Sequence, residues 1–191
     1  MRKRTLIVIA AIAVVATAAA IMSARDSARV AHAGEPLFPA LLENINRVVQ
    51  VAGTSGGETF TLVHEKGRWI VPEKLGYPAD QTKVRQLVLG AAQLERIEPK
   101  TSNPELYGEL GLGDADQAGG KAVHFVLEDA AGDALAEFVV GEERPARGDP
   151  QADEYYVREP SDPQSWLVQG KIAIERNALD WLDQTVLSLA R

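Results

Sequence analysis

The run of twenty uncharged residues at positions 5–24 constrains this chain more than any other feature. As a helix rising about 1.5 Å per residue it would span about 30 Å, the thickness of the hydrocarbon core of a bilayer. Eight of the twenty are Leu, Ile or Val, and each favours insertion by about 0.3–0.6 kcal/mol. Arg2, Lys3 and Arg4 precede the run and orient the N-terminus toward the cytoplasm. The run therefore predicts a single-pass helix in the inner (cytoplasmic) membrane, with residues 26–191 on the periplasmic side.

A cleaved signal peptide is the alternative interpretation of the same segment. Ala31, His32 and Ala33 stand before Gly34 in the A-x-A form of a cleavage site. The apolar run is longer than the usual stretch of about 7–15 residues, and the charged residues at 25–29 separate it from that site. We therefore expect an uncleaved anchor, although both interpretations export the remainder of the chain. The sequence has no cysteine, which excludes a lipid-modified cysteine.

Charge divides the chain at the same boundary. Residues 1–33 hold five Lys or Arg and one acidic residue, and the whole-chain charge of −7 then leaves −11 for residues 34–191. A region this acidic binds nucleic acid and anionic lipid poorly, because both carry negative charge. Without cysteine it has no disulfide and no thiolate metal site. The sequence predicts a basic tip, anchor and short stalk over residues 1–33, followed by one extracytoplasmic domain over residues 34–191.

Hydrophobic patterning predicts an α+β fold for the exported part. Strands are expected at residues 47–52, 59–64, 68–71, 122–127, 135–140, 155–158 and 166–168, with a short extended piece at 96–100. Helices are expected at 80–94 and 178–189, with shorter turns at 37–42 and after Asn103. Asp80 is a good N-cap, and one apolar stripe of the first helix should face the core: Val84, Leu87, Val88, Ala91 and Leu94. The result is a set of antiparallel β-meanders with packed amphipathic helices, in two halves of similar plan.

One short motif raises the question of catalysis. Gly53, Ser55 and Gly57 have the G-x-S-x-G spacing of a hydrolase nucleophile elbow. An elbow needs a helix directly after the serine, whereas residues 59–63 alternate as a strand does. The glycines at 53, 56 and 57 are expected to supply the positive φ angles of a hairpin turn. The pattern favours a hairpin with Ser55 as a loop serine.

The remaining motifs for chemistry are incomplete. Residues 64–68 begin like the zinc-protease H-E-x-x-H, but position 68 is arginine. His64, His124 and His32 lack a second ligand at metal-binding spacing. The loop at 113–120 resembles the start of an EF-hand and the end of a P-loop, without the residues that bind calcium or magnesium. We therefore predict no catalytic, cofactor-binding or metal-ligating residue.

Two further features bear on binding. The acidic segment at 141–154 is expected to be a long loop, with contact to a partner as the alternative. The aromatic residues Trp69, Trp166, Trp181, Tyr155 and Tyr156 are interpreted as core anchors. A sugar-binding platform is the alternative for them, and it would need several of these rings exposed on one face.

An ordered set of segments gives the chain a family resemblance. It comprises "GRWIV" at 67–71, "YPADQTKVRQLVLGAAQLERIEPKT" at 77–101, "NPELYGELGL" at 103–112, "YYVRE" at 155–159 and "DWLDQTVL" at 180–187. In this order they resemble the domain of unknown function 4340 family over about residues 45–190, although Glu109 and Leu110 interrupt its tyrosine-glycine-leucine element. No catalytic or binding residues are established for that family. The resemblance implies a membrane-attached extracytoplasmic protein, often encoded beside ABC-transporter components similar to gliding-motility accessory proteins.

These observations lead to two hypotheses. The first is a non-enzymatic, membrane-anchored extracytoplasmic accessory or interaction domain, with an ABC-transporter component as the partner that the resemblance implies. The alternative is an extracytoplasmic glycan- or peptide-binding module. Exposed aromatic rings on a concave face would favour the second hypothesis, and a flat surface with an apolar strip would favour the first.

Overall fold

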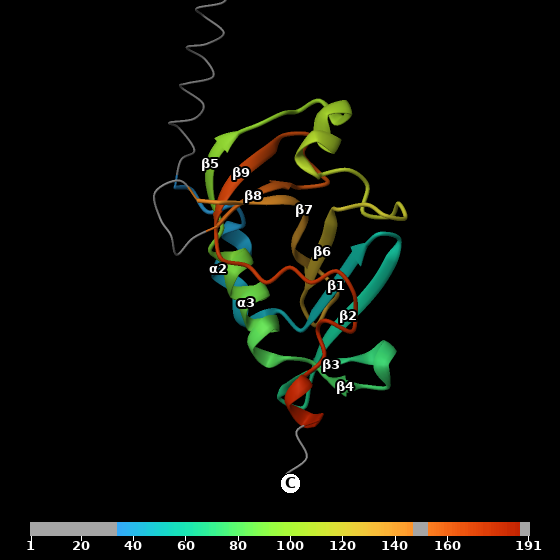
Figure 1. The fold of residues 1–191 in the computed structure, drawn as a ribbon. Helices are drawn as coiled ribbons and strands as arrows, with labels where there is room; N and C mark the ends of the chain where they lie inside the picture. The colour runs from blue at the N-terminus through green and yellow to red at the C-terminus, as the bar shows by residue number, and fades with distance from the viewer. Residues whose placement is uncertain (1–33, 147–152, 188–191) are drawn as a thin grey trace, which may run out of the picture.

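The computed structural model describes residues 34–146 and 153–187, which form one curved antiparallel sheet with helices packed on it (Figure 1). Among these residues there are nine strands, in the order β4-β3-β2-β1-β6-β7-β8-β9-β5. The strands are β1 (Gln50–Ser55), β2 (Glu58–Glu65), β3 (Arg68–Val71), β4 (Tyr77–Pro78), β5 (Glu95–Pro99), β6 (Val123–Glu128), β7 (Ala134–Pro145), β8 (Asp153–Arg158) and β9 (Ser165–Gly170). The α+β class and the antiparallel meanders are confirmed. Because β1 pairs with β6, the two meanders join into a single sheet.

The first two hairpins turn at glycine-containing segments of the sequence. Gly56 and Gly57 have φ angles of 60° and 82° between β1 and β2, and Lys66 and Gly67 have 49° and 82° between β2 and β3. Two successive positive φ angles characterise the tight turn whose twist matches that of paired strands. The expectation for Gly53 was wrong, because this glycine lies inside β1 with the ring of its cross-strand partner Phe60 against it. A Cβ there would lie 2.1 Å from the ring.

Helix α3 (Gln81–Ala92) confirms the clearest helical prediction. The carboxylate of Asp80 accepts hydrogen bonds from the backbone N–H groups of Thr82 and Lys83, at 2.9 and 3.1 Å, and so caps two free donors. The whole predicted apolar stripe is buried. The shorter helix α2 (Pro39–Asn44) contacts both β7 and α3. The two helices cover one face of the sheet (Figure 1).

A chain of aromatic rings runs through the main core between the sheet and these helices. Trp181 lies 5.9 Å from Phe60, which lies 6.3 Å from Phe125. Phe125 lies 5.7 Å from Phe138, which in turn lies 4.9 Å from Phe38. These separations are typical of packed aromatic pairs. The rings connect the C-terminal segment, both meanders and the residue that precedes α2.

A second, smaller core lies on the opposite face of the sheet. The 3-10 helix η3 (Pro104–Leu110) begins at Asn103, whose side chain accepts the N–H of Glu105 at 3.1 Å, as the Asn-Pro pair predicted. Beyond η3 the chain covers β6, β7 and β8 with four buried residues and their partly buried neighbours: Leu112, Ala115, Ala122, Val139, Tyr107, Leu110 and Tyr156.

The predicted C-terminal helix at 178–189 is wrong over the described residues. The chain there makes turns, a single bridge and the short 3-10 helix η4 (Gln184–Leu187). The backbone carbonyl of Trp181 accepts the N–H of Asp80, and the N–H of Asp183 donates to Pro78. Leu182 also pairs with Ala79 as a β-bridge. These backbone groups therefore bond to the start of α3 instead of to the next helical turn.

The acidic segment at 141–154 was predicted as a loop, and most of its described part is strand instead. Strand β7 continues through a register shift to Pro145, pairing Glu143 with Tyr155 and Arg144 with Glu154 of β8. Residues 147–152 lie outside the described residues. A bulge explains the error, because the extra residues interrupt the alternating pattern by which strands are recognised.

The predicted membrane anchor at 5–24 lies outside the described residues, as does the stalk that follows it. Within residues 34–146 and 153–187, no helix has the length and apolar character needed to cross a bilayer. Gly34 is the first described residue, and its N–H donates to the carbonyl of Arg96 at 2.9 Å. Residues 34–37 thus lie along the outer edge of β5.

Candidate functional site

The serine of the G-x-S-x-G motif is a structural residue. Ser55 is the last residue of β1 and is only 6% exposed, so it is buried where a loop serine was expected. Its hydroxyl donates to the carbonyl oxygen of Ala122 at 3.0 Å. A strand, β2, follows the turn. The arrangement has neither the helix nor the exposed hydroxyl of a nucleophile elbow.

The described histidines lie far from one another on the sheet. His64 is exposed near the end of β2, with its ring 5.2 Å from that of Trp69. The Nε2 atom of His124 lies 3.0 Å from a carboxylate oxygen of Glu137 on the neighbouring strand. His32 is outside the described residues, and within them no three His, Cys, Asp or Glu side chains group as metal ligands would.

The loop at 113–120 serves to brace the β1–β2 hairpin. Its Ala115 is buried, and the carbonyl of Ala115 accepts the N–H of Gly57 at 3.1 Å. Close turns within the loop, such as the bond from Gly120 N–H to Gln117 at 2.9 Å, leave no cradle of EF-hand or P-loop form. The loop is part of the second core.

The five aromatic residues singled out from the sequence divide into two groups. Trp181 and Tyr155 are buried, at 0% and 2% exposure, and confirm the core interpretation. Trp69, Trp166 and Tyr156 are half-buried. Arg96 lies over the Trp166 ring at 5.1 Å. Trp69 alone of this group lines a hollow on the surface described next.

An amphipathic hollow lies between α3 and the β2–β3 hairpin, and we call it the α3 groove. It encloses about 360 Å³. An apolar floor and a polar rim line it, formed by Ile45, Val48, Val49, Trp69, Val88, Leu89, Asn46, His64, Gly67, Gln81 and Arg85. Leu89 remains 41% exposed although it belongs to the floor. A concave apolar surface with a few polar groups is the usual form of a binding site.

The position of Trp69 in the α3 groove is fixed by Gln81. The Gln81 side-chain oxygen accepts the backbone N–H of Trp69, and its amide group donates to the backbone carbonyl of Trp69, both at 3.0 Å. The same amide donates to the carbonyl of Ala79 at 2.7 Å. Gln81 therefore acts as a short piece of partner strand for β3 and ties α3 to the hairpin. The groove is consequently preformed by the fold.

A larger hollow of about 600 Å³ lies at the β7 bulge, and six of its nine lining residues are charged. Its carboxylates largely have partners within the chain. Lys121 lies 3.4 Å from Glu142, and the amide of Asn177 hydrogen-bonds to Asp180. Glu175 pairs with Lys83 at 2.5 Å. Since these charges satisfy one another, this hollow is a weaker candidate for a ligand.

A third hollow of about 300 Å³ beside α2 contains a perturbed carboxyl group. Burial raises the pKa of Glu159, against the opposing effect of Arg96, whose guanidinium lies 3.5 Å away. The same guanidinium lies 3.9 Å from Glu35 and donates to the carbonyl of Leu37. These contacts hold residues 34–37 against β5, so Glu159 is a structural carboxyl group whose raised pKa follows from burial.

A pH effect on stability is expected from Asp129 in the β6–β7 turn. Hydrogen bonds from the N–H groups of Ala131 and Asp133, at 2.9 and 3.1 Å, and the ion pair with Arg47 hold its pKa below the ordinary value of 3.8. A lowered pKa stabilises the fold above the unfolded-state pKa, and that stabilisation is lost as the pH falls. Asp129→Asn should lower the Tm at pH 7, and the difference from wild type should shrink by pH 3.

Thermal unfolding at pH 7, 5 and 3 provides the measurement. Asp133→Asn is the matched control, because this carboxylate lies in the same turn but is exposed. A Tm difference for Asp129→Asn that stays constant across the three pH values would contradict the assignment.

The sequence analysis did not identify the residues of α3 that line the α3 groove. Gln81, Arg85 and Leu89 follow one another at i, i+4 and i+8 along α3, outside the buried stripe. An isolated leucine on the polar side of an amphipathic helix was the available signal, because such a residue is exposed without an evident partner.

Comparison with known proteins gives a family and nothing closer. No curated protein and no solved structure matches the chain. A family model, described as a domain of unknown function (DUF4340), matches residues 69–191, beginning at the Trp69 of the α3 groove. The match spans α3, η3 and the second meander, and it confirms the resemblance stated from the ordered segments. The chain belongs to the domain of unknown function 4340 family.

Proposed function

We propose that this protein is a non-enzymatic, membrane-anchored interaction domain that binds a segment of a partner protein in the α3 groove. The observation that carries the proposal is the half-exposed apolar floor of a preformed groove. Leu89 is 41% exposed, and Trp69, which packs beside the main core, is only half-buried. Apolar surface kept open in a hollow is typical of a site that a partner covers.

The groups around the groove support binding over catalysis. The His64 ring contacts Trp69, and the polar atoms of Gln81 bond to the backbone. A general base needs a nucleophile or a reacting group within hydrogen-bond reach. Ser55, the residue with a catalytic spacing, belongs to the opposite end of β1 and bonds to Ala122. We therefore propose no reaction for this chain.

The proposed location rests on the sequence. The uncharged run at 5–24 behind a basic cluster supports a single-pass anchor in the inner membrane with the domain in the periplasm. The family resemblance supports a component of an ABC-type transport system as the partner. Residues 34–37 are held along β5 by backbone bonds and by Arg96, so the domain would join its stalk at the β5 edge.

A glycan- or peptide-binding module is the second candidate, and the Trp69–His64 pair favours it. A sugar ring stacks on an exposed aromatic face, and the Trp69 ring lines the groove. Glycan binding would be indicated if glycans quenched the tryptophan fluorescence of the wild-type protein but not of a Trp69 variant. The crosslinking experiment described next would then give no protein adduct.

Site-directed photocrosslinking in intact membranes tests the first proposal. The full-length protein carries Leu89→p-benzoylphenylalanine, with the same replacement at Leu75 and at Leu179 as controls. Those leucines are 101% and 60% exposed and lie outside the groove. We expect one discrete protein adduct from position 89 and none from the controls. A carbonate wash of a separate, unirradiated portion of the same membranes tests the anchor.

Two results would count against the proposal. Identical adducts from all three positions would mean that the groove is not a specific surface. Absence of any adduct from position 89, with full-length protein retained in the membrane, would mean that no protein covers the groove there.

A further inference from the structure

We propose that the occupant of the α3 groove is an acidic polypeptide segment, whose carboxylate pairs with Arg85 while an apolar side chain two residues away covers Leu89 and Trp69. This inference rests on the proposed function, since it specifies the chemistry of the partner for the same groove.

Charge complementarity is the first observation behind it. Residues 34–191 carry a net charge of −11, yet none of the eleven residues that line the groove is acidic. Its ionisable side chains are Arg85 and His64. The groove is therefore a positively charged recess in an otherwise acidic domain. An acidic segment would be attracted to this recess and repelled by the surface around it.

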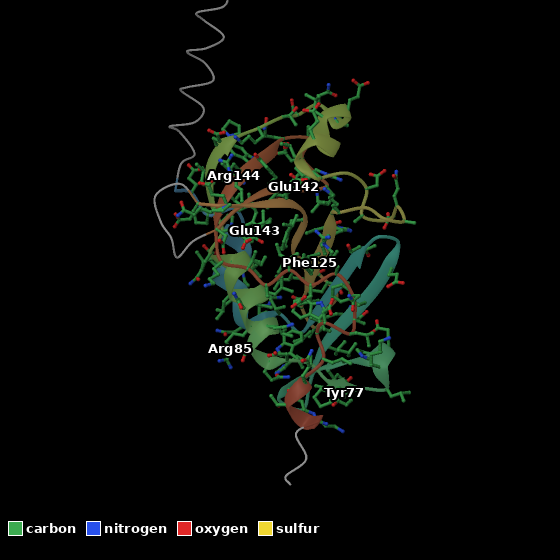
Figure 2. All side chains as sticks on the ribbon, in the orientation of Figure 1. Tyr77, Arg85, Phe125, Glu142, Glu143 and Arg144 are labelled. Atoms are coloured by element: carbon green, nitrogen blue, oxygen red, sulfur yellow. The ribbon has the colours of Figure 1, made fainter. Side chains whose placement is uncertain are left out.

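Arg85 is also available for an external carboxylate. It is exposed, and within the described residues no acidic side chain lies within ion-pair distance of it. Among the described residues, Arg47 pairs with Asp129, Arg96 with Glu159 and Arg144 with Glu154. Exposed Arg68 and Arg176 resemble Arg85 in having no ion pair there, but they lie outside the groove. Figure 2 shows Arg85 on the lower part of α3, away from Glu142 and Glu143 in the upper part of the view. A guanidinium binds a carboxylate through two parallel hydrogen bonds.

Among the polar residues on the rim of the groove, Arg85 is the one that can select a ligand by charge. Gln81 has its side chain fully bonded to the backbone of residues 69 and 79. The exposed amide of Asn46 is neutral. A ligand that only needed hydrogen bonds would have no use for a guanidinium, whereas a carboxylate gains a charge-assisted pair from it.

The spacing along α3 then sets the spacing in the ligand. Arg85 lies three to four residues before Val88 and Leu89, which corresponds to about 5–6 Å along a helix. In an extended peptide, residues i and i+2 point to the same side about 6.6 Å apart. The matching pattern is an acidic residue, any residue, and then an apolar residue.

Fluorine NMR of the full-length protein in detergent micelles tests this, with 5-fluorotryptophan at its three tryptophans. The Trp69→Phe variant identifies the Trp69 resonance, and the buried Trp181 reports whether the fold is intact. The probe is the peptide acetyl-Ser-Asp-Thr-Leu-Ser-amide at low salt. Controls are the same peptide with Asn in place of Asp, and one with Asp and Leu adjacent. We expect the first peptide to shift the Trp69 resonance at a concentration at least tenfold lower than either control.

Two variants distinguish the contribution of the Arg85 charge from that of the groove itself. Arg85→Gln should remove the preference for Asp over Asn, whereas Arg176→Gln should keep it. Arg176 is the matched control because it is an exposed arginine lining the other, charged hollow. Equal binding of the Asp and Asn peptides, or a preference that survives Arg85→Gln, would overturn this inference but leave the groove as a peptide site. A Trp69 resonance that no peptide moves would overturn both proposals.

Discussion

Replacing Leu87 with alanine is expected to lower the free energy of unfolding by about 2–5 kcal/mol. Leu87 is fully buried on the inner face of α3, within the main core. Its removal leaves a cavity between the helix and the sheet, and the surrounding side chains relax only partly. The loss would be a large share of the total stability of about 5–15 kcal/mol that is typical of a domain. Urea denaturation followed by circular dichroism measures it.

Leu89→Ala is the matched control, because this residue lies only two positions further along the same helix. It is 41% exposed and lines the α3 groove, so its loss should cost less than about 1 kcal/mol. The same substitution should weaken peptide binding in the groove. If Leu87→Ala instead left the Tm unchanged and abolished binding, the buried stripe would be the interface and the packing described for α3 would be wrong.

This pair of residues also shows what the sequence could predict. The stripe that contains Leu87 repeats with the period of a helix, and Asp80 stands at its start as an N-cap. Both signals are local, and both are confirmed. The strand with clear alternation, β6 (Val123–Glu128), was likewise placed to within one residue of the predicted 122–127. Local periodicity therefore gave the α+β class and the antiparallel order of each meander.

The predictions that failed depend on contacts between distant residues. The pattern of residues 178–189 fits an amphipathic helix, but the backbone there bonds to Pro78 and Asp80 instead. The extension of β7 past its bulge depends on pairing with Tyr155 and Glu154 across the hairpin. Neither partner can be identified from the period of one segment alone.

The α3 groove could not be predicted from the sequence for the same reason. It forms only because Gln81 on α3 replaces a partner strand for Trp69, and because Ile45 of the 3-10 helix η1 (Ile45–Arg47) and Val49 just before β1 also line it. Each of these residues has an ordinary local pattern. Their convergence depends on the register of β2 against β3 and on where α3 crosses them. The exposed Leu89 was the one local sign of this surface.

Trp181→Ala is expected to lower the free energy of unfolding by about 3–5 kcal/mol. Trp181 is fully buried against Phe60, and its carbonyl accepts the N–H of Asp80 at 2.8 Å. Trp181 therefore anchors the C-terminal segment together with the backbone bonds to Pro78 and Ala79, and it stabilises the start of α3. Trp181→Phe should cost less than half as much, because it keeps an aromatic ring and removes an indole N–H that is buried without a hydrogen-bond partner.

Hydrogen exchange locates the effect as well as measuring it. In Trp181→Ala the amide of Asp80 should exchange faster by a larger factor than that of Leu127, since its bond to the backbone carbonyl of residue 181 opens more often once the indole no longer anchors the segment. A variant that unfolded at the wild-type urea concentration would contradict the packing described for this segment. Because α3 carries Arg85 and Leu89, loosening its first turn should also weaken peptide binding at temperatures well below the Tm. Trp181, which the sequence pattern placed in a helix, would then be a residue that maintains the structure of the α3 groove.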